Sequence, residues 1–554
     1  MTLQVPYEYP LTPGPVGEYV AVVDYDAPNR CYYEPVDLND RWLLANDGLS
    51  PAESDPRFHQ QMVYAVVSET ISRFKFALGR DLAWHRSRTD STFGNRLLLI
   101  PHGIQEANAF YDPTMHAIVF GYFTASETDP GSNIPGQTVF TCLAHDIIAH
   151  ETTHALVDGI RRFFMEPTNP DVPAFHEAFA DIVALFQHFS VQEALVEALR
   201  GTRGTLYREP SPDVKPEGAP QIGAEQKRNN PLVILANQFG DGIGLHSGLR
   251  QCIGTTPDPK ALEHMIEPHE RGQILVAAVF DAFFTIFLRR TADLWRIAGI
   301  SRDDARDVDL QGDLLYRLAA EASKTARQVE TLCIRALDYC PPVDITFGDY
   351  LRALITADHD LVRDDDLGYR AAFIDAFRMR GIHPDSVTSY SEESLLWTPP
   401  GKRTRLPGLR MPSAGITYEE RRSVLGKNAK MLFSFAQANA ASLGIVKKEN
   451  IFVDSFHAIN RVGPDGNIVF EMVAEVIEKG QHEDTGDDPR TYGGVTMVFD
   501  SQGNLRYAVR KSLKNDRSTN QAAFRRELWE RTAVGPYSPY QNTTLDFRAI
   551  HRGF

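Results

Sequence analysis

The chain has 554 residues, and 57 Lys and Arg against 73 Asp and Glu give it a formal net charge of −16. At roughly 100–200 residues per domain, this length predicts several folded units with separate cores. The acidic balance argues against a broad surface for nucleic acid or for anionic membranes. Five cysteines without a C-x-x-C pair favour a reducing compartment, and the first residues lack the basic and apolar regions of a signal peptide, so we expect a cytoplasmic protein.

The first two thirds of the chain combine extended runs with helical periodicity. Residues 1–55 are rich in proline and acidic side chains and predict an irregular N-terminal arm. Apolar residues at helical spacing follow over 58–74, and then come two extended runs, 96–100 and 117–123. From 142 to 382 most of the pattern is helical, and no apolar stretch reaches the ~18 residues that span a bilayer.

The composition changes over residues 383–415, where Ser, Pro and Arg cluster, and this segment predicts a linker. Beyond it the pattern is that of a small α+β domain over residues 416–554. Its expected elements are a helix over 417–443, strand pairs over 451–479 and 492–511, and a short helix over 521–531.

The sharpest motif is His150-Glu151-Thr-Thr-His154. On a helix, residues i and i+4 share a face, so both imidazoles can point at one metal ion. Glu151 then lies beside the metal, where a general base for a water molecule is needed. A chance match to this motif is expected only about 0.03 times in a chain of this size.

A second helical motif supplies a carboxylate. Glu177 lies 23 residues beyond His154, and Asp181 follows it by four residues on the same helical face. Two histidines and one carboxylate form a recognised ligand set for catalytic zinc, with a fourth position left open. Asp181 is spaced to accept the free ring N–H of a ligand histidine. Taken alone, the two acids would more often be solvated surface charges, but the upstream motif reverses that interpretation.

Two weaker signals complete the candidate site. In Gly240-Asp241-Gly-Ile-Gly-Leu-His246, a glycine-rich turn brings a histidine near an acid that can orient its ring. A lone histidine after a glycine loop is more often structural, by about two to one. Asn108 and Ala109 precede the extended run over 117–123, and a strand edge at this point could hold an extended peptide.

These segments, in this order, resemble the thermolysin-type gluzincin zinc metallopeptidases. The resemblance covers roughly residues 56–382, and it rests on the stretch 146–158, on Glu177-Ala-Phe-Ala-Asp181, on Asp241 with His246, and on Asn108-Ala-Phe. It implies an α+β protein with a two-lobed, thermolysin-like catalytic module. The N-terminal lobe would span 56–165 and carry the HExxH helix, and a mainly helical second lobe would span 166–382.

The resemblance also implies a ligand set. His150, His154 and Glu177 would hold one zinc ion per chain, and Asp181 would support a ligand histidine. We expect no double calcium site of the family's kind, because His188 stands where an acidic calcium ligand would be needed.

The implied function is that of a cytoplasmic zinc metalloendopeptidase, which hydrolyses peptide bonds in peptide or protein substrates. Glu151 would assist the attack of a zinc-bound water on the peptide carbonyl. His246, held by Asp241, would stabilise the oxyanion, and Asn108 and Ala109 would bind substrate.

One departure from the family's pattern concerns the oxyanion. No tyrosine lies between His154 and Glu177, so the family's second oxyanion donor is missing or comes from elsewhere. Two alternatives stay open: a catalytically inactive zinc-binding homologue that acts as a binding or regulatory module, and a zinc amide hydrolase of small molecules. As a hypothesis, the domain over 416–554 limits or recruits substrate, which would be intramolecular regulation.

Overall fold

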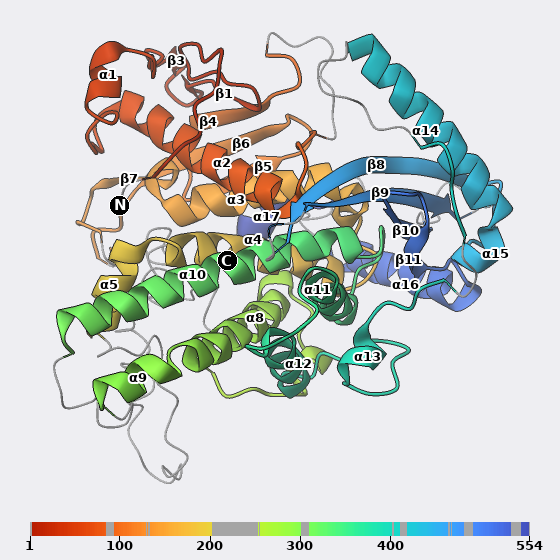
Figure 1. The fold of residues 1–554 in the computed structure, drawn as a ribbon. Helices are drawn as coiled ribbons and strands as arrows, with labels where there is room; N and C mark the ends of the chain where they lie inside the picture. The colour runs from red at the N-terminus through yellow and green to blue at the C-terminus, as the bar shows by residue number, and fades with distance from the viewer. Residues whose placement is uncertain are drawn as a thin grey trace.

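A computed structural model of the chain describes residues 3–84, 93–128, 130, 133–201, 253, 255–300, 310–400, 404–409, 418–463, 466, 468–480, 491–532 and 544–552. The architecture is mixed α+β, with 48% helix and 18% strand, which confirms the predicted fold class at this level. Figure 1 shows one sheet formed by the N-terminal part of the chain (red to orange), a second formed by its C-terminal part (blue), and a body of helices beside both.

The first sheet is formed by strands that precede the HExxH helix in the chain. Its strands, in spatial order, are β1 (Val20–Val22), β4 (Leu97–Ile104), β6 (Ala117–Thr124) and β5 (Ala109–Asp112), with β7 (Thr138–Phe140) also paired to β6. β4 and β6 contain the two predicted extended runs, and they run parallel. β5 is antiparallel to β6 and lies at the edge of the strand order.

Helix α2 (Pro56–Leu78) packs on this sheet and contains the predicted helical segment. Asp55 caps its N-terminus by accepting the N–H of Arg57. Gly79 ends it with φ 67°, and a Cβ at this position would collide with the backbone of Asn460. Glycine is therefore required both for the left-handed turn and for the close approach of a C-terminal strand.

Helices α3 (His145–Ile160) and α4 (Asp171–Phe189) pack against each other in the interior. α3 also contacts α2 and β5, while α4 contacts α8 (Pro268–Arg290) and α10 (Gly312–Ala336). Nearly every residue of α3 and α4 is buried. A polar side chain on either helix therefore needs a partner within the protein or a bound ligand.

Shorter helices complete the body. They are α1 (Arg41–Ala45), α5 (Gln192–Gly201), α9 (Ala292–Ala298), α11 (Phe347–Leu361), α12 (Tyr369–Met379) and α13 (Glu392–Leu395). The stretch Pro268–Ala298, which joins α8 to α9, is long and apolar enough to cross a membrane, but 72% of its apolar window is buried inside the protein. This is the pattern of a core helix.

The second sheet has the order β11-β10-β9-β8 and is antiparallel throughout. Its strands are β8 (Ile451–Val462), β9 (Ile468–Lys479), β10 (Tyr492–Asp500) and β11 (Leu505–Lys511). The predicted strand pairs are both present. The flanking helices are α14 (Tyr418–Ala438), α15 (Ala440–Leu443) and α16 (Asn515–Thr532).

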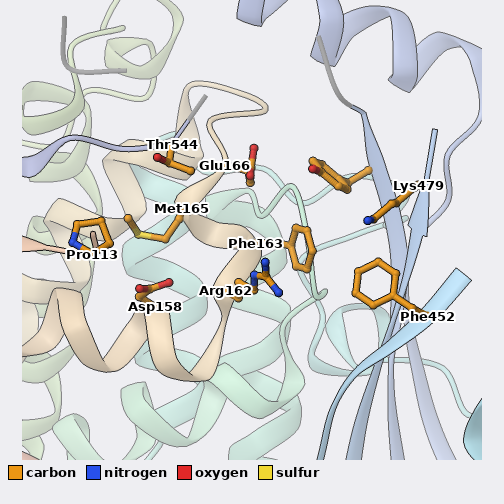
Figure 2. Close-up of a pocket in the computed structure, with 10 residues that line it drawn as sticks. Pro113, Asp158, Arg162, Phe163, Met165, Glu166, Phe452, Lys479 and Thr544 are labelled. Carbon is orange, nitrogen blue, oxygen red and sulfur yellow. The ribbon is translucent and has the colours of Figure 1, made fainter. Parts of the chain in front are cut away.

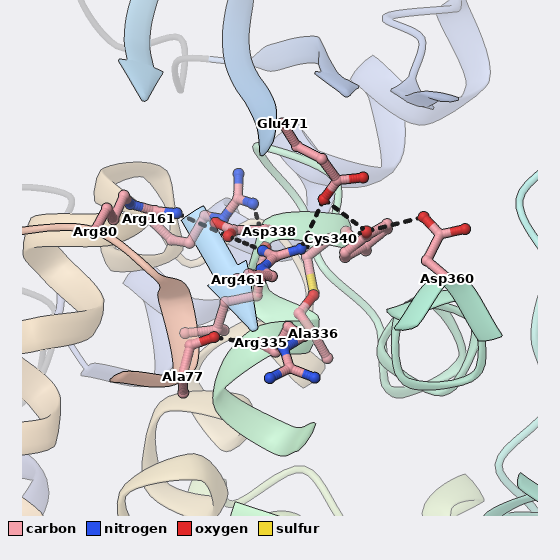
Figure 3. A network of polar contacts seen from close by, with 12 residues as sticks. Ala77, Arg80, Arg161, Arg335, Ala336, Asp338, Cys340, Asp360, Arg461 and Glu471 are labelled. Carbon is pink, nitrogen blue, oxygen red and sulfur yellow. Dashed lines mark hydrogen bonds and ion pairs between the residues drawn. The ribbon is translucent and has the colours of Figure 1, made fainter. Parts of the chain in front are cut away.

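A buried ionic network joins this second sheet to the helical body (Figure 3). Asp338 accepts from Arg80 Nη1 at 2.7 Å and also from Arg461 on β8. Arg161, at the end of α3, pairs with Glu475 on β9. Burial opposes the charge on Asp338, but Arg80 and Arg461 lower its pKa to about 2. The sheet is therefore fixed to the helix that carries the HExxH motif.

Two C-terminal segments return to the body. Trp397, inside the segment predicted as a linker, is buried and donates its Nε1–H to the carbonyl of Tyr339 at 2.9 Å. Helix α17 (Phe547–Arg552), near the end of the chain, packs on β5 of the first sheet. Trp397 and α17 thus pack on elements that lie far earlier in the chain.

Candidate metal centre

Helix α3 places the two motif histidines on one face, as their spacing predicts. The Nε2 atoms of His150 and His154 lie 3.0 Å apart, and both side chains are buried. Ile148, Ala149 and Leu156 on the same helix are buried as well. Burial lowers the pKa of His154 well below its ordinary value, so this imidazole is neutral and its Nε2 is available as a ligand.

Helix α4 brings the predicted carboxylate to the same point. Glu177 Oε2 lies 3.4 Å from His150 Nε2, and Glu177 Oε1 lies 3.7 Å from His154 Nε2. Glu177 is 2% exposed, and within the described residues neither of its oxygens has a hydrogen-bond partner. Although burial opposes ionisation, the imidazoles of His269, His154 and His150 lower its pKa well below the ordinary value.

The outer nitrogens of both ligand histidines are occupied. His150 Nδ1 lies 3.0 Å from Asp181 Oδ1, as predicted, and His154 Nδ1 lies 3.4 Å from His176 Nδ1. Burial lowers the pKa of His176 to about 4, so it is a neutral acceptor for the N–H of His154. Each contact fixes a ring and directs the Nε2 atom toward the other ligands.

Glu151 lies beside this cluster and does not point away from it. Its Oε2 accepts the backbone N–H of Tyr111 on β5 at 2.9 Å, and the side chain is 1% exposed. Burial raises the pKa of Glu151. A raised pKa brings a carboxyl closer to the range in which it can both take and return a proton near neutral pH.

Two further histidines reach the cluster, and no spacing along the chain indicates them in advance. His269, on α8, has Nε2 at 3.2 Å from Glu177 Oε2 and Nδ1 at 3.0 Å from Glu267 Oε1. His551, on α17, has Nε2 at 3.5 Å from Glu177 Oε2 and Nδ1 at 3.5 Å from Glu151 Oε1. They follow Glu177 by 92 and 374 residues, so only tertiary structure brings them here.

The donor set fits a metal ion. Ligand atoms of His150, Glu151, His154 and His551 all lie within 4.8 Å of one another, and so do those of Glu177, His269 and His551. Two ring nitrogens that face each other at 3.0 Å repel unless a cation or a proton lies between them. The carboxylate of Glu177, whose oxygens accept no hydrogen bond within the described residues, adds negative charge at the same point. A divalent cation would satisfy all three groups at once.

The other predicted site residues fall into two groups. Asn108 and Ala109 lie at the edge strand β5 next to the cluster, where Tyr111 contacts Glu151. Asp241 and His246 lie outside the described residues, so their roles stay predictions.

A second buried histidine pair lies between α2, which carries His59, and strand β4 of the first sheet, which carries His102. His59 Nδ1 and His102 Nε2 are 2.8 Å apart, and Cys142 lies within reach of both. Here the outer nitrogens contact Asp24 Oδ1 at 2.7 Å and the carbonyl of Glu53 at 2.9 Å. A single proton between the two rings completes this set of hydrogen bonds.

A pocket of about 210 Å³ opens beyond the C-terminal end of α3, between that helix and the second sheet (Figure 2). Its acids are paired within the protein: Asp158 accepts from the hydroxyl of Tyr111 at 2.8 Å, and Glu166 from Arg525 at 2.7 Å. The histidine cluster, and not this pocket, is therefore the candidate functional site.

Comparison with known proteins gives no family to which the chain can be assigned. No protein-family model, no curated protein and no solved structure matches it.

Proposed function

We propose that the protein is a zinc-dependent metallopeptidase of the thermolysin-like gluzincin type, with a two-lobed catalytic module. The observation that carries the proposal is the convergence of His150, His154 and Glu177 on one buried point, with Glu151 beside it. A non-catalytic zinc protein has no use for a buried carboxylate in the position of Glu151, so we favour an enzyme over the inactive alternative.

The chemistry of the ligands supports zinc. Two imidazole nitrogens and one carboxylate are a ligand set of catalytic zinc, whereas calcium and magnesium prefer oxygen ligands alone. Bound zinc lowers the pKa of a water molecule to about 7 and polarises a carbonyl group. Asp181 and His176 would tune the ligands by holding their outer nitrogens.

Glu151 would serve as the general base and then as the general acid. Its carboxylate would take a proton from the attacking water and deliver that proton to the leaving amine. The backbone N–H of Tyr111 holds one of its oxygens, which orients the other toward the cluster. His246, supported by Asp241, remains our candidate for stabilising the oxyanion.

A peptide substrate suits the setting of the site. β5 lies at the edge of its sheet, and an edge strand offers backbone N–H and carbonyl groups to an extended peptide. Of the predicted binding residues, Ala109 begins this strand and Asn108 precedes it, and Tyr111, which holds Glu151, lies two residues beyond Ala109. A peptide paired there would present a carbonyl group to the metal.

The test compares the wild type with Glu151→Gln, which keeps the shape of the side chain and removes the base. Each zinc-loaded protein is incubated with a peptide library, and both zinc content and cleavage products are measured by mass spectrometry. We expect one zinc per chain in both proteins and a loss of cleavage of about 10²–10⁴-fold in Glu151→Gln. Equal cleavage by the two proteins would refute the assigned role, and cleavage of small amides alone would favour the small-molecule alternative.

A further inference from the structure

The last described segment of the chain, Thr544–Arg552, lies on the metal centre. It enters beside the end of α3, where the N–H of Leu545 donates to the carbonyl of Met165 at 3.1 Å. It then forms α17, which packs on the edge strand β5. We refer to residues 544–552 as the C-terminal plug.

The plug occupies the residues predicted to bind substrate. Asn108 Nδ2 donates to the carbonyl of Arg548 at 3.3 Å, and the carbonyl of Ala109 accepts from His551 Nδ1 at 2.9 Å. Glu106 pairs with Arg548 Nη2 at 2.9 Å and with Arg552 Nε at 3.0 Å. An incoming peptide would need the same backbone and side-chain groups, so the plug and a substrate exclude each other.

The plug also covers the ligands themselves. The ring of Phe547 stacks on the imidazole of His154, with centroids 4.0 Å apart and planes inclined by 23°. His551 lies between the two catalytic carboxylates, 3.5 Å from Glu151 and 3.5 Å from Glu177. Its side chain is only 11% exposed.

The hydrogen bonding of His551 determines which nitrogen is free. Because the carbonyl of Ala109 can only accept, His551 Nδ1 carries a proton, and in the neutral ring Nε2 then keeps its lone pair. Nε2 is buried and has no hydrogen-bond partner among the described residues. A ring N–H held by a backbone carbonyl, with the other nitrogen facing a carboxylate and two imidazoles, is the usual arrangement of a metal-ligating histidine.

We propose that His551 is a fourth protein ligand of the metal, and that the C-terminal plug holds the protein in a closed, self-inhibited state. This inference rests on the proposed function. Catalytic zinc sites keep one position open for water or substrate, whereas sites with four protein ligands are closed. With His551 bound and β5 covered, both the open position and the substrate edge are taken by the chain itself. Substrate is cleaved only by the fraction of molecules in which the plug has left.

The first test measures metal coordination and not activity. The full-length chain is loaded with Co²⁺ alone, whose visible absorption depends on the number and type of its ligands. We expect His551→Ala to change the cobalt spectrum, because water replaces an imidazole nitrogen, while the exposed-histidine control His264→Ala keeps the wild-type spectrum. A wild-type spectrum in His551→Ala would overturn the ligand assignment.

The second test releases the plug without touching the ligands. Arg548→Glu with Arg552→Glu places three acidic side chains together at Glu106, and the control Arg296→Glu with Arg363→Glu makes the same change of charge at exposed positions. We expect the first variant to cleave a peptide library at least about tenfold faster than the wild type, because the competent fraction rises, and the control to match the wild type. No increase would overturn self-inhibition.

The third test uses a synthetic peptide with the sequence of residues 544–552 as an inhibitor. It should inhibit the released variant, and the same peptide with alanine in place of the histidine should inhibit at least about tenfold less well. Equal inhibition by both peptides would overturn the role of His551.

If the cobalt spectrum responds to His551→Ala but no variant cleaves any peptide, the ligand assignment stands and the peptidase proposal fails. If the wild type and the released variant cleave equally well, the peptidase proposal stands and the plug fails.

Discussion

Two buried histidine pairs in this protein look alike and differ in what faces them. His150 and His154 approach to 3.0 Å, and His59 and His102 approach to 2.8 Å. Each pair has one ring whose outer nitrogen contacts an aspartate, Asp181 in the first pair and Asp24 in the second. By residue type, burial and distance alone, both would be candidate metal sites.

The two pairs differ in the hydrogen bonds made by the carboxylate beside each pair. Asp24 uses both oxygens, since His102 occupies Oδ1 and the amide of Gln60 donates to Oδ2 at 2.9 Å. Glu177, which faces the first pair, has no hydrogen bond to either oxygen within the described residues. The pair between α2 and the sheet is therefore complete with one shared proton, whereas the carboxylate beside the pair on α3 faces imidazoles at 3.2–3.7 Å without a hydrogen bond to them. Buried carboxylate oxygens that lack hydrogen bonds, more than the proximity of histidines, indicate the better candidate for a metal site.

The largest expected effect separates the two pairs by zinc affinity. His154→Ala removes a proposed direct ligand. Loss of an outer partner costs up to about 100-fold in metal affinity, so the zinc affinity of His154→Ala should fall by more than that. His102→Ala, the matched variant in the other pair, should bind zinc as the wild type does. Isothermal titration with zinc measures both. If His102→Ala loses zinc, the second pair is a metal site and the contrast fails.

A smaller effect is expected from the outer aspartates. Asp181→Asn weakens the support of His150 and should reduce zinc affinity by about 10- to 100-fold. Asp24→Asn changes the equivalent residue of the other pair and should leave zinc affinity unchanged. Competition with a coloured chelator reports both values, and equal zinc affinity in Asp181→Asn and the wild type would contradict a ligand role for His150.

Asp24→Asn should instead reduce the stability of the fold. Asp24 is 6% exposed and holds His102 and Gln60, so its loss leaves buried donors without a charged acceptor. We expect a cost of about 1–3 kcal/mol in the free energy of unfolding. Urea denaturation measures it against the exposed control Asp385→Asn. Identical unfolding midpoints would mean that the hydrogen bonds of Asp24 contribute nothing to stability.

The smallest effect concerns pH. Burial and, after it, the neighbouring His102 lower the pKa of His59 to about 4, below its unfolded value of 6.5. The unfolded chain then binds a proton more readily, so this group stabilises the fold above pH 6.5 and loses that contribution as the pH falls toward 4. We expect protonation of His59 to lower the free energy of unfolding by about 1 kcal/mol between pH 6.5 and 5.5. In His59→Gln, the free energy of unfolding should fall by about 1 kcal/mol less over this pH range than in the wild type. An unchanged pH dependence would exclude His59 as the cause of the loss.

Local spacing made the core of the site predictable. The closeness of His150, His154 and Asp181 follows from the i, i+4 geometry of helices, and Asp181 Oδ1 lies 3.0 Å from the outer nitrogen of His150, while their roles at a metal stay predictions. The suggested substrate edge at Asn108 and Ala109 lies at the start of β5, an edge strand. These features depend on a few neighbouring residues, so tertiary contacts did not need to be known.

The long-range partners could not be predicted. His551 is 397 residues beyond His154, and no periodicity links a short C-terminal helix to an edge strand in the first sheet. Trp397 lies in a segment whose composition indicates a linker, yet it packs on the body through contacts that composition does not encode. Such contacts come from the packing of the whole chain.

The most direct measurement of the central claim is zinc stoichiometry in the wild type, in Glu177→Gln and in the exposed-acid control Glu263→Gln. Each full-length protein is equilibrated with zinc buffered at a nanomolar free concentration and analysed by mass spectrometry under non-denaturing conditions. We expect one zinc per chain in the wild type and in Glu263→Gln, and little or none in Glu177→Gln. A wild type without zinc, or a Glu177→Gln variant that binds zinc as the wild type does, would contradict the assignment of His150, His154 and Glu177 as the metal ligands.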